Sequence, residues 1–259
     1  MPAGRTPPAA PDYVAGHGLL AGKAVLVTAA AGTGIGFATA KRCLEEGAEV
    51  VLSDAHERRL GEAADELGVE GIVCDVTDED AVQALVSGAV ERLGRLDVVV
   101  NNAGLGGTAA LVDMTDEQWS IVLDVTLTGT FRMTRAVLRV MRDQGEGVLV
   151  NNASVLGWRA QAGQAHYAAA KAGVMALTRC AAVEAAEFGV RVNAVAPSLA
   201  MHKFLAKVTS DDLLAELAGR EAFGRAAEPW EVANVIVFLA SPYSSYMTGE
   251  VVAVSSQRA

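Results

Sequence analysis

The sequence predicts a single α/β domain in which a doubly wound parallel sheet carries helices on both faces. Short valine-rich runs alternate with longer helical patterns from Gly22 to Val254. This alternation is typical of a parallel sheet with right-handed crossovers. Most of the short runs are apolar throughout, as expected of strands that are covered on both faces. No change of composition and no internal repeat divides the chain, so we expect one domain over residues 20–259.

The elements follow in order along the chain. The expected strands are Ala24–Thr28, Val50–Asp54, Gly71–Cys74, Asp97–Asn101, Gly147–Asn151, Arg191–Val195 and Val251–Val254. The expected helices are Gly34–Glu46, Glu57–Leu67, Asp78–Leu93, Asp116–Gln144, Gln164–Phe188 and Pro229–Ala240. Thr77 or Asp78 can cap the third helix, and Gly189 follows the fifth.

Composition excludes several classes of protein. Hydrophobic residues make up 51% of the 259 residues, which excludes a wholly disordered chain. The net charge of −10 argues against nucleic-acid binding. No apolar run reaches transmembrane length, so we expect no membrane partner. Three scattered cysteines fit a reducing cytoplasm, and the four histidines form no ligand pattern, so we expect a cytoplasmic location and no metal site.

Two segments stand apart from this pattern. Residues 1–19 begin with a stretch rich in proline, alanine and glycine, and we expect a flexible tail; an arm that packs on a neighbouring subunit is the alternative. Residues 198–228 contain no clear strand and many apolar residues. They leave the carboxyl end of a strand, where ligands bind, so we expect a substrate lid; a core helix is the alternative.

A glycine-rich turn follows the first strand. Thr28 ends that strand, and Gly32, Gly34, Ile35 and Gly36 lead into the next helix. Such a turn lets the backbone approach a pyrophosphate, and the helix N-terminus supplies free N–H groups and positive potential. Tight turns need glycine for other reasons too, so the position of the turn directly after the first strand carries the prediction of a nucleotide site.

Polar residues at the ends of the next strands extend this predicted site. Asp54 ends the second strand, where a carboxylate suits the adenosine ribose hydroxyls and repels a 2′-phosphate. We therefore expect NAD rather than NADP, although Arg58 and Arg59 could reach a phosphate. Asp75 could accept a hydrogen bond from the adenine amino group or take part in helix capping. Asn102, Ala103 and Gly104 could form a wall against the adenosine or a simple turn.

Tyr167 and Lys171 lie four residues apart in the fifth predicted helix, with Ser154 thirteen residues before the tyrosine. Positions i and i+4 share one helix face. An ammonium group beside a phenol lowers the pKa of the phenol, which makes it a competent general acid/base. Alone, the spacing is more often a surface pair, and its context raises the catalytic interpretation above that alternative.

The chain resembles the classical short-chain dehydrogenase/reductase family from Leu20 to Val254. The matching segments are Thr28–Gly36, Asp75, Asn101–Gly104, Ser154, Tyr167–Lys171, Arg191–Pro197, Gly224–Arg225, Pro229–Ala233, Phe238–Ser241 and Thr248–Gly249. The resemblance implies a Rossmann-type fold and hydride transfer between a nicotinamide and a carbinol or carbonyl carbon. It further implies that Val76, Pro197 and Ser198 contact the cofactor, and that the two long helices form a homodimer or homotetramer.

The resemblance also implies catalytic roles. Tyr167 would be the general acid/base, Lys171 would bind the nicotinamide ribose, and Ser154 would polarise the substrate oxygen. Thr126 stands where the family carries a catalytic asparagine, and its hydroxyl could hold a relay water in place of that residue.

Three other positions depart from the family pattern. The glycine turn is one residue longer, with Ala29 and Ala30 where its first glycine would fall. His202 stands near the position of a threonine beside the nicotinamide; the histidine either meets the site or lies on the lid surface. Ser255-Ser256 replaces a glycine pair.

The expected function is therefore an NAD(H)-dependent interconversion of a secondary alcohol and a ketone. The apolar lid favours a small-molecule substrate that is hydrophobic or acyl-linked, such as a hydroxysteroid, an alicyclic alcohol or a 3-hydroxyacyl thioester. An NADPH-dependent 3-oxoacyl thioester reductase is the enzymatic alternative. A non-catalytic NAD-binding sensor is the alternative from another class.

Overall fold

A parallel sheet of seven strands forms the centre of the protein in the computed structural model, which describes residues 9–201 and 211–256. The strands are β1 (Ala24–Thr28), β2 (Glu49–Asp54), β3 (Glu70–Val73), β4 (Val98–Asn101), β5 (Gly147–Asn152), β6 (Val190–Pro197) and β7 (Val251–Val254). Their order in the sheet is β3-β2-β1-β4-β5-β6-β7. The strand order therefore reverses between β1 and β4, where doubly wound sheets bind their ligands.

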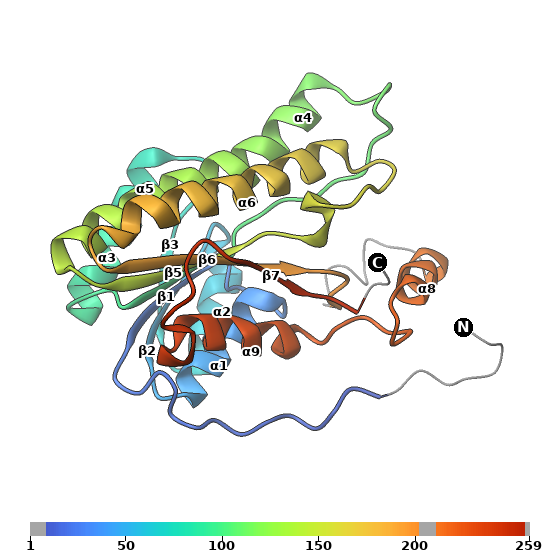
Figure 1. Ribbon diagram of the computed structural model, residues 1–259. Helices are drawn as coiled ribbons and strands as arrows, with labels where there is room; N and C mark the ends of the chain where they lie inside the picture. The colour runs from blue at the N-terminus through green and yellow to red at the C-terminus, as the bar shows by residue number, and fades with distance from the viewer. Residues whose placement is uncertain (1–8, 202–210, 257–259) are drawn as a thin grey trace.

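Helices cover both faces of this sheet (Figure 1). They are α1 (Ile35–Glu45), α2 (Glu57–Leu67), α3 (Glu79–Leu93), α4 (Asp116–Leu123), α5 (Gly129–Gln144), α6 (Ala165–Ala186), α8 (Asp211–Arg220) and α9 (Pro229–Ala240). One cluster of buried side chains joins α1, α2 and α9 to the sheet, and a second joins α3, α5 and α6 to the other face. Burying β1 and β4 between both clusters explains why their sequences are apolar throughout.

The expected strands and helices are confirmed, with one difference in the fourth helix and with an additional helix, α8, inside the segment 198–228. The expected helix Asp116–Gln144 contains a π-helical turn at Asp124–Thr128, between α4 and α5. Such turns interrupt the regular hydrogen-bond ladder and often lie at functional sites. Asp78 rather than Thr77 caps α3, because its side chain accepts hydrogen bonds from Asp80 N and Ala81 N.

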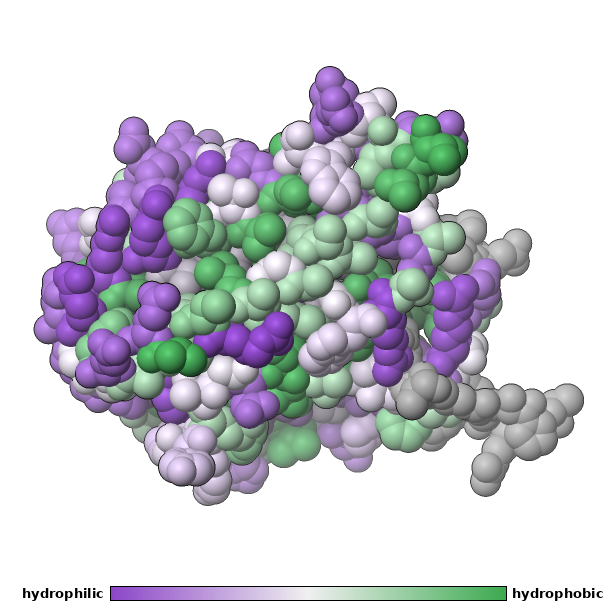
Figure 2. All heavy atoms as spheres, turned by 45° about the horizontal axis from the view of Figure 1, so that its top comes forward, coloured by the Kyte–Doolittle hydropathy of each residue, from purple (hydrophilic) through white to green (hydrophobic). Residues whose placement is uncertain are grey.

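The outer faces of α5 and α6 carry a groove of about 400 Å³. Phe131, Leu138, Leu177 and Phe188 lie among its lining residues, and the Phe131 side chain is 41% exposed. Figure 2 turns this helical layer toward the reader and shows hydrophobic residues gathered over its middle. In the described ranges, no helix is both long enough and apolar enough to cross a membrane.

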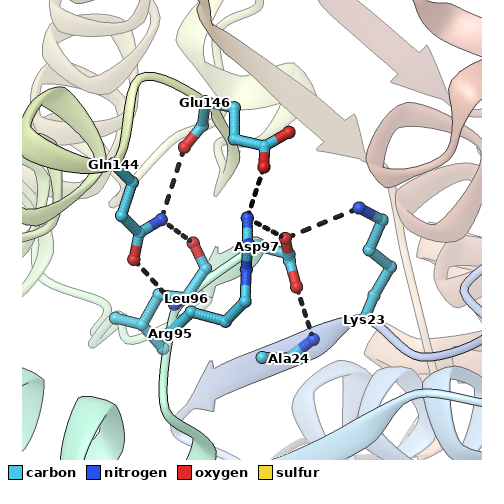
Figure 3. A network of polar contacts seen from close by, with 7 residues as sticks. All are labelled: Lys23, Ala24, Arg95, Leu96, Asp97, Gln144 and Glu146. Carbon is cyan, nitrogen blue, oxygen red and sulfur yellow. Dashed lines mark hydrogen bonds and ion pairs between the residues drawn. The ribbon is translucent and has the colours of Figure 1, made fainter.

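A network of charges closes the amino-terminal edge of the sheet (Figure 3). The buried Asp97 carboxylate accepts a hydrogen bond from Ala24 N at 2.9 Å and pairs with Arg95 at 2.8 Å and Lys23 at 3.5 Å. Arg95 also pairs with Glu146, directly before β5. These contacts tie β1, β4 and β5 together at the edge opposite to their carboxyl ends, which leaves the carboxyl edge for ligands.

Part of the N-terminal segment lies along α1. The buried Glu46 side chain accepts hydrogen bonds from His17 N at 2.8 Å and Leu19 N at 3.0 Å, and it pairs with Arg42. Arg42 donates to the Val14 carbonyl, and the Tyr13 ring packs edge-on against Trp230. This differs from the expectation of a flexible tail over residues 1–19, because backbone groups of residues 14–19 satisfy a buried ion pair. Residues 1–8 lie outside the described chain.

The segment expected to form a lid leaves and rejoins the domain at one place. Ala200 and Ala227 form a parallel bridge, with hydrogen bonds Met201 N to Ala227 O and Ala227 N to Leu199 O. Ser198 N also donates to Val254 O at the end of β7. The excursion thus starts at the carboxyl edge of the sheet, as the lid prediction requires; residues 202–210, which include His202, lie outside the described part.

Candidate active site

The turn after β1 has the geometry of an anion site. Gly34 precedes α1 without a side-chain cap, and the first turn of α1 has no acidic residue. The first N–H groups of the helix therefore remain available for a phosphate. A Cβ atom on Gly36 would lie 2.3 Å from Ala29 O and 2.6 Å from Asn102 Nδ2, so only glycine fits there. The residues present fit the pyrophosphate of a dinucleotide.

Ala29 carries the backbone conformation expected of the missing first glycine. Its φ is +49°, in the left-handed region that L-residues with a side chain avoid. Gly32 has a φ of +95°. The longer turn therefore still reverses the chain direction directly after β1, and the strained residue in it is Ala29.

The carboxyl end of β4 braces this turn. The Thr28 hydroxyl accepts hydrogen bonds from Asn102 N at 2.9 Å and Ala103 N at 3.3 Å. The Asn102 amide group in turn donates to the carbonyls of Thr28 and Ala29. The structure thus brings Thr28, Asn102 and Ala103 together beside the glycine turn, as predicted.

Asp54 reaches from the end of β2 to the same turn. Its carboxylate accepts hydrogen bonds from Ala31 N at 3.2 Å and from His56 N at 2.9 Å. Arg58 pairs with Glu62 at 2.6 Å on the same helix. The negative charge of Asp54 therefore lies against the glycine turn, while the Arg58 guanidinium is engaged elsewhere.

Asp75 and Val76 follow β3 at the same edge of the sheet. The Asp75 carboxylate accepts hydrogen bonds from the Thr77 backbone at 2.9 Å and from the Thr77 hydroxyl at 2.7 Å. Asp75 thus forms a local turn, and Asp78 caps α3. Val76 is buried, and a Cβ atom on Gly129 would lie 2.6 Å from its side chain.

Ser154, Tyr167 and Lys171 meet at the carboxyl end of β5. The Ser154 side chain hydrogen-bonds to the Tyr167 phenol, and it also accepts from Leu156 N at 3.2 Å. The Lys171 ammonium lies 5.6 Å from the centroid of the Tyr167 ring and donates to the Asn152 carbonyl. The structure therefore brings the three predicted catalytic residues into one site.

Burial moves the two titrating groups in opposite directions. It raises the pKa of Tyr167 to about 12, although the hydrogen bond from Ser154 lowers it by a smaller amount. Burial also lowers the pKa of Lys171 to about 8. This differs from the expectation that Lys171 lowers the pKa of Tyr167, because desolvation disfavours the charged form of both groups. At neutral pH the phenol is therefore protonated and able to donate a proton.

A glycine-rich segment covers these residues. Gly104 lies against Lys171, Gly106 against Tyr167 and Gly107 against His166, because a Cβ atom on each would lie 3.3, 3.9 and 3.2 Å from those side chains. Any larger residue at Gly104 or Gly107 would crowd its neighbour. The sequence therefore needs small residues after β4 for a close approach to α6.

The α6 helix holds the far end of this segment. The Gln164 amide donates to Gly107 O at 2.8 Å and to the Thr108 hydroxyl at 3.1 Å. Ala109 N donates to Gly163 O at 3.1 Å. Gln164 was not among the predicted site residues, and its place directly before α6 is the only signal that the sequence offers.

Thr126 fastens the same segment from the π-helical turn. Its buried hydroxyl accepts from Leu105 N at 2.9 Å and donates to Leu105 O at 3.1 Å. Its own carbonyl accepts a hydrogen bond from Thr130. Because the hydroxyl proton is donated to Leu105, Thr126 could bind a relay water only as an acceptor, and that role stays a prediction. The geometry makes Thr126 a brace for the cover over Lys171.

Pro197 ends β6 at the same edge, and Ser198 follows it and donates to Val254 O at the end of β7. Asn152 is a site residue that the sequence argument missed, because the fifth strand was expected to end at Asn151. The available signal was the repeated Asn-Asn pair at the ends of two neighbouring strands, Asn101-Asn102 and Asn151-Asn152.

Relief of the strain at Ala29 should stabilise the protein. Ala29→Gly removes a left-handed cost of about 1–2 kcal/mol, against an entropic loss of about 0.5–1 kcal/mol. We expect the free energy of unfolding to rise by roughly 0.5–1 kcal/mol in urea denaturation. The matched control Ala30→Gly, at a buried position without a positive φ, should lower it. A loss of stability in both variants would contradict the strain at Ala29.

Removal of the Thr126 hydroxyl should loosen the cover over Lys171. Thr126→Val keeps the shape of the side chain but removes both hydrogen bonds to the Leu105 backbone, at a cost of about 0.5–1.5 kcal/mol in unfolding free energy for each bond. Thr126→Ser keeps the hydroxyl and should retain most of that stability. Equal stability of the Val and Ser variants in urea denaturation would show that the hydroxyl is not the brace.

The chain resembles known proteins over nearly its full length. Residues 29–256 match the family model described as enoyl-(acyl carrier protein) reductase. A Mycobacterium tuberculosis protein named (5R,7aS)-5-hydroxy-7a-methyl-1-oxo-2,3,5,6,7,7a-hexahydro-1H-indene-carboxyl-CoA reductase is 67% identical, over 96% of this chain and 97% of its own. A 3-oxoacyl-(acyl-carrier-protein) reductase from Thermotoga maritima is 41% identical, over 91% of this chain and 97% of its own.

Solved structures give the same result. The crystal structure of a short chain dehydrogenase from Mycobacterium smegmatis is 64% identical, with a TM-score of 0.87, and the match covers 97% of this chain and 99% of that one. The extent and identity of these matches agree with the sheet order and with the three residues at the end of β5. The chain belongs to the short-chain dehydrogenase/reductase family.

Proposed function

We propose that this oxidoreductase uses NAD(H) to interconvert a ketone and a secondary alcohol on an alicyclic, acyl-linked substrate. The observation that carries the proposal is the hydrogen-bonded Ser154–Tyr167 pair, which lies beside the buried Lys171 at the carboxyl edge of the sheet. A protonated phenol suits proton donation to a carbonyl oxygen.

The residues of the chain divide the work of this reaction. A nicotinamide bound beside Tyr167 would supply the hydride for the carbonyl carbon. The Ser154 hydroxyl would hold the carbonyl oxygen, and Tyr167 would donate its proton to that oxygen. Lys171 would bind ribose hydroxyls and, when charged, favour the phenolate that remains.

The charge at the glycine turn supports NAD(H) over NADP(H). The Asp54 carboxylate is fastened to Ala31 N, so a 2′-phosphate at the end of β2 would meet a negative charge. The turn from Ala29 to Gly36 contains no lysine or arginine. The ion pair between Arg58 and Glu62 leaves that arginine less free to bind a phosphate.

The substrate class is supported by the 67% identical relative, whose name describes a bicyclic ring system joined to CoA. Partly exposed apolar residues follow three elements near the carboxyl edge: Leu105 after β4, Trp158 after β5 and Phe223 after α8. Such side chains suit a fused hydrocarbon ring.

The second candidate is an NADPH-dependent 3-oxoacyl thioester reductase. It is favoured by the 41% identical relative named 3-oxoacyl-(acyl-carrier-protein) reductase.

The groove on α5 and α6 supports a homo-oligomer, as a dimer or tetramer. Phe131, Leu138 and Leu177 line it, and exposed apolar patches of this kind often mark protein interfaces.

Phe131→Asp should lower the mass observed in sedimentation velocity to that of one chain. The control Leu111→Asp, at a 68% exposed position outside the groove, should not. A wild-type monomer at micromolar concentration would contradict the interface.

The function is tested by the reduction of a bicyclic ring ketone carried on a CoA thioester. We expect faster initial rates with NADH than with NADPH, measured at 340 nm. Tyr167→Phe should lower kcat by a factor of about 10²–10⁴ while NADH binding is retained. A strong NADPH preference would contradict the role of Asp54, and unchanged turnover in Tyr167→Phe would contradict the role of the phenol.

A further inference from the structure

Four asparagines at the ends of β4 and β5 point to two different layers. Asn101 and Asn151 are paired in register, and their amide groups bond to Thr130 on α5 and Thr178 on α6. Successive residues of a strand face opposite sides of the sheet. Asn102 and Asn152 therefore face the other layer, where α1 starts, and they bond to each other at 2.8 Å.

We infer that Asn152 is a positioning residue, which joins Lys171 to the cofactor-binding turn through Asn102. This inference rests on the proposed function, since it concerns how the same site holds its nicotinamide cofactor. It extends that function by naming a residue outside the Ser154, Tyr167 and Lys171 set.

The hydrogen bonds determine the orientation of both amides. Asn102 Nδ2 lies 3.3 Å from Thr28 O and 3.1 Å from Ala29 O, and two carbonyl oxygens can only accept. The NH₂ group of Asn102 must therefore face the turn, which leaves its Oδ1 as an acceptor. Asn152 must then offer its own NH₂ group, so the direction of the chain of bonds is fixed from one end to the other.

The far end of this chain is Lys171. Its ammonium donates to the backbone carbonyl of Asn152, so the same residue contacts the lysine through its backbone and Asn102 through its side chain. The near end is equally confined, because a Cβ atom on Gly36 would lie 2.6 Å from Asn102 Nδ2. A displacement of Asn102 would therefore shift the first turn of α1 and the strained Ala29.

One polar atom of Asn152 remains for a ligand. Its Oδ1 is buried, and no group in the described part of the chain donates a hydrogen bond to it. A buried acceptor without a donor is costly unless water or a bound molecule supplies one. The hydroxyl or amide groups of a nicotinamide ribose unit have the required chemistry. Valine or alanine at this position would offer no acceptor and would leave Asn102 Oδ1 unpaired.

The test measures the dissociation constant of NADH by tryptophan-to-NADH energy transfer, together with thermal unfolding. Asn152→Ala removes the side chain, and Asn152→Asp keeps its shape while replacing the donor NH₂ group by an acceptor oxygen. We expect each to raise the NADH dissociation constant by about three- to tenfold. The double variant Asn102→Ala/Asn152→Ala should lose no more affinity than the worse single variant, because both interrupt one chain.

Gln83→Ala is the matched control, since it removes an amide that, within the described residues, bonds to Glu79 on α3. It should leave NADH binding unchanged. A lower melting temperature with unchanged NADH affinity in both Asn152 variants would overturn the inference, because that is the result of a merely structural role. If Asn152→Ala does not fold, Asn152→Asp decides the question alone. A wild-type chain that binds neither NADH nor NADPH would overturn the proposed function and this inference together.

Discussion

The packing of the half-buried Tyr167 and the buried Lys171 against residues 104–107 is the constraint on which the rest of the site depends. This packing reduces the solvation of both groups, which disfavours phenolate and ammonium alike. The phenol is consequently kept as an acid, and the lysine titrates at about 8. The pKa values of Tyr167 and Lys171 have thus moved apart, and the environment of the two groups, independently of the sequence motif, identifies Tyr167 as the proton donor.

Several elements distant in the sequence hold this cover in place. Thr126, in the π-helical turn, binds both backbone groups of Leu105, and Gln164 binds the backbone of Gly107. The reversal of strand order places the cover beside the glycine turn, and the chain of bonds through Asn102 joins the two. The charged network at the opposite edge, around Asp97, fixes the strands without occupying the carboxyl edge.

Much of this could be predicted from sequence, because it depends on local patterns. Apolar runs such as Val25–Val27 predict strands wherever they fall, and the order of the Thr28, Ser154 and Tyr167 motifs predicts that they meet. What the sequence could not predict depends on how distant segments dock. From sequence alone, the Thr126 hydroxyl has no evident partner, whereas in the fold it hydrogen-bonds to the Leu105 backbone. From sequence alone, Lys171 is expected to lower the pKa of Tyr167, whereas in the fold desolvation raises that pKa. Residues 14–19 have a tail-like composition, yet their backbone groups satisfy Arg42 and Glu46.

The ionisation of Tyr167 is the most direct measurement of this account. Tyrosine labelled with ¹³C at Cζ would be titrated by NMR in the cofactor-free protein, with Tyr167→Phe used to assign the resonance. The account predicts that Tyr167 stays protonated until the pH approaches about 12. Ionisation of Tyr167 below about pH 10, the ordinary value of a tyrosine, would contradict the claim that desolvation, rather than Lys171, governs the pKa of Tyr167 in the resting site.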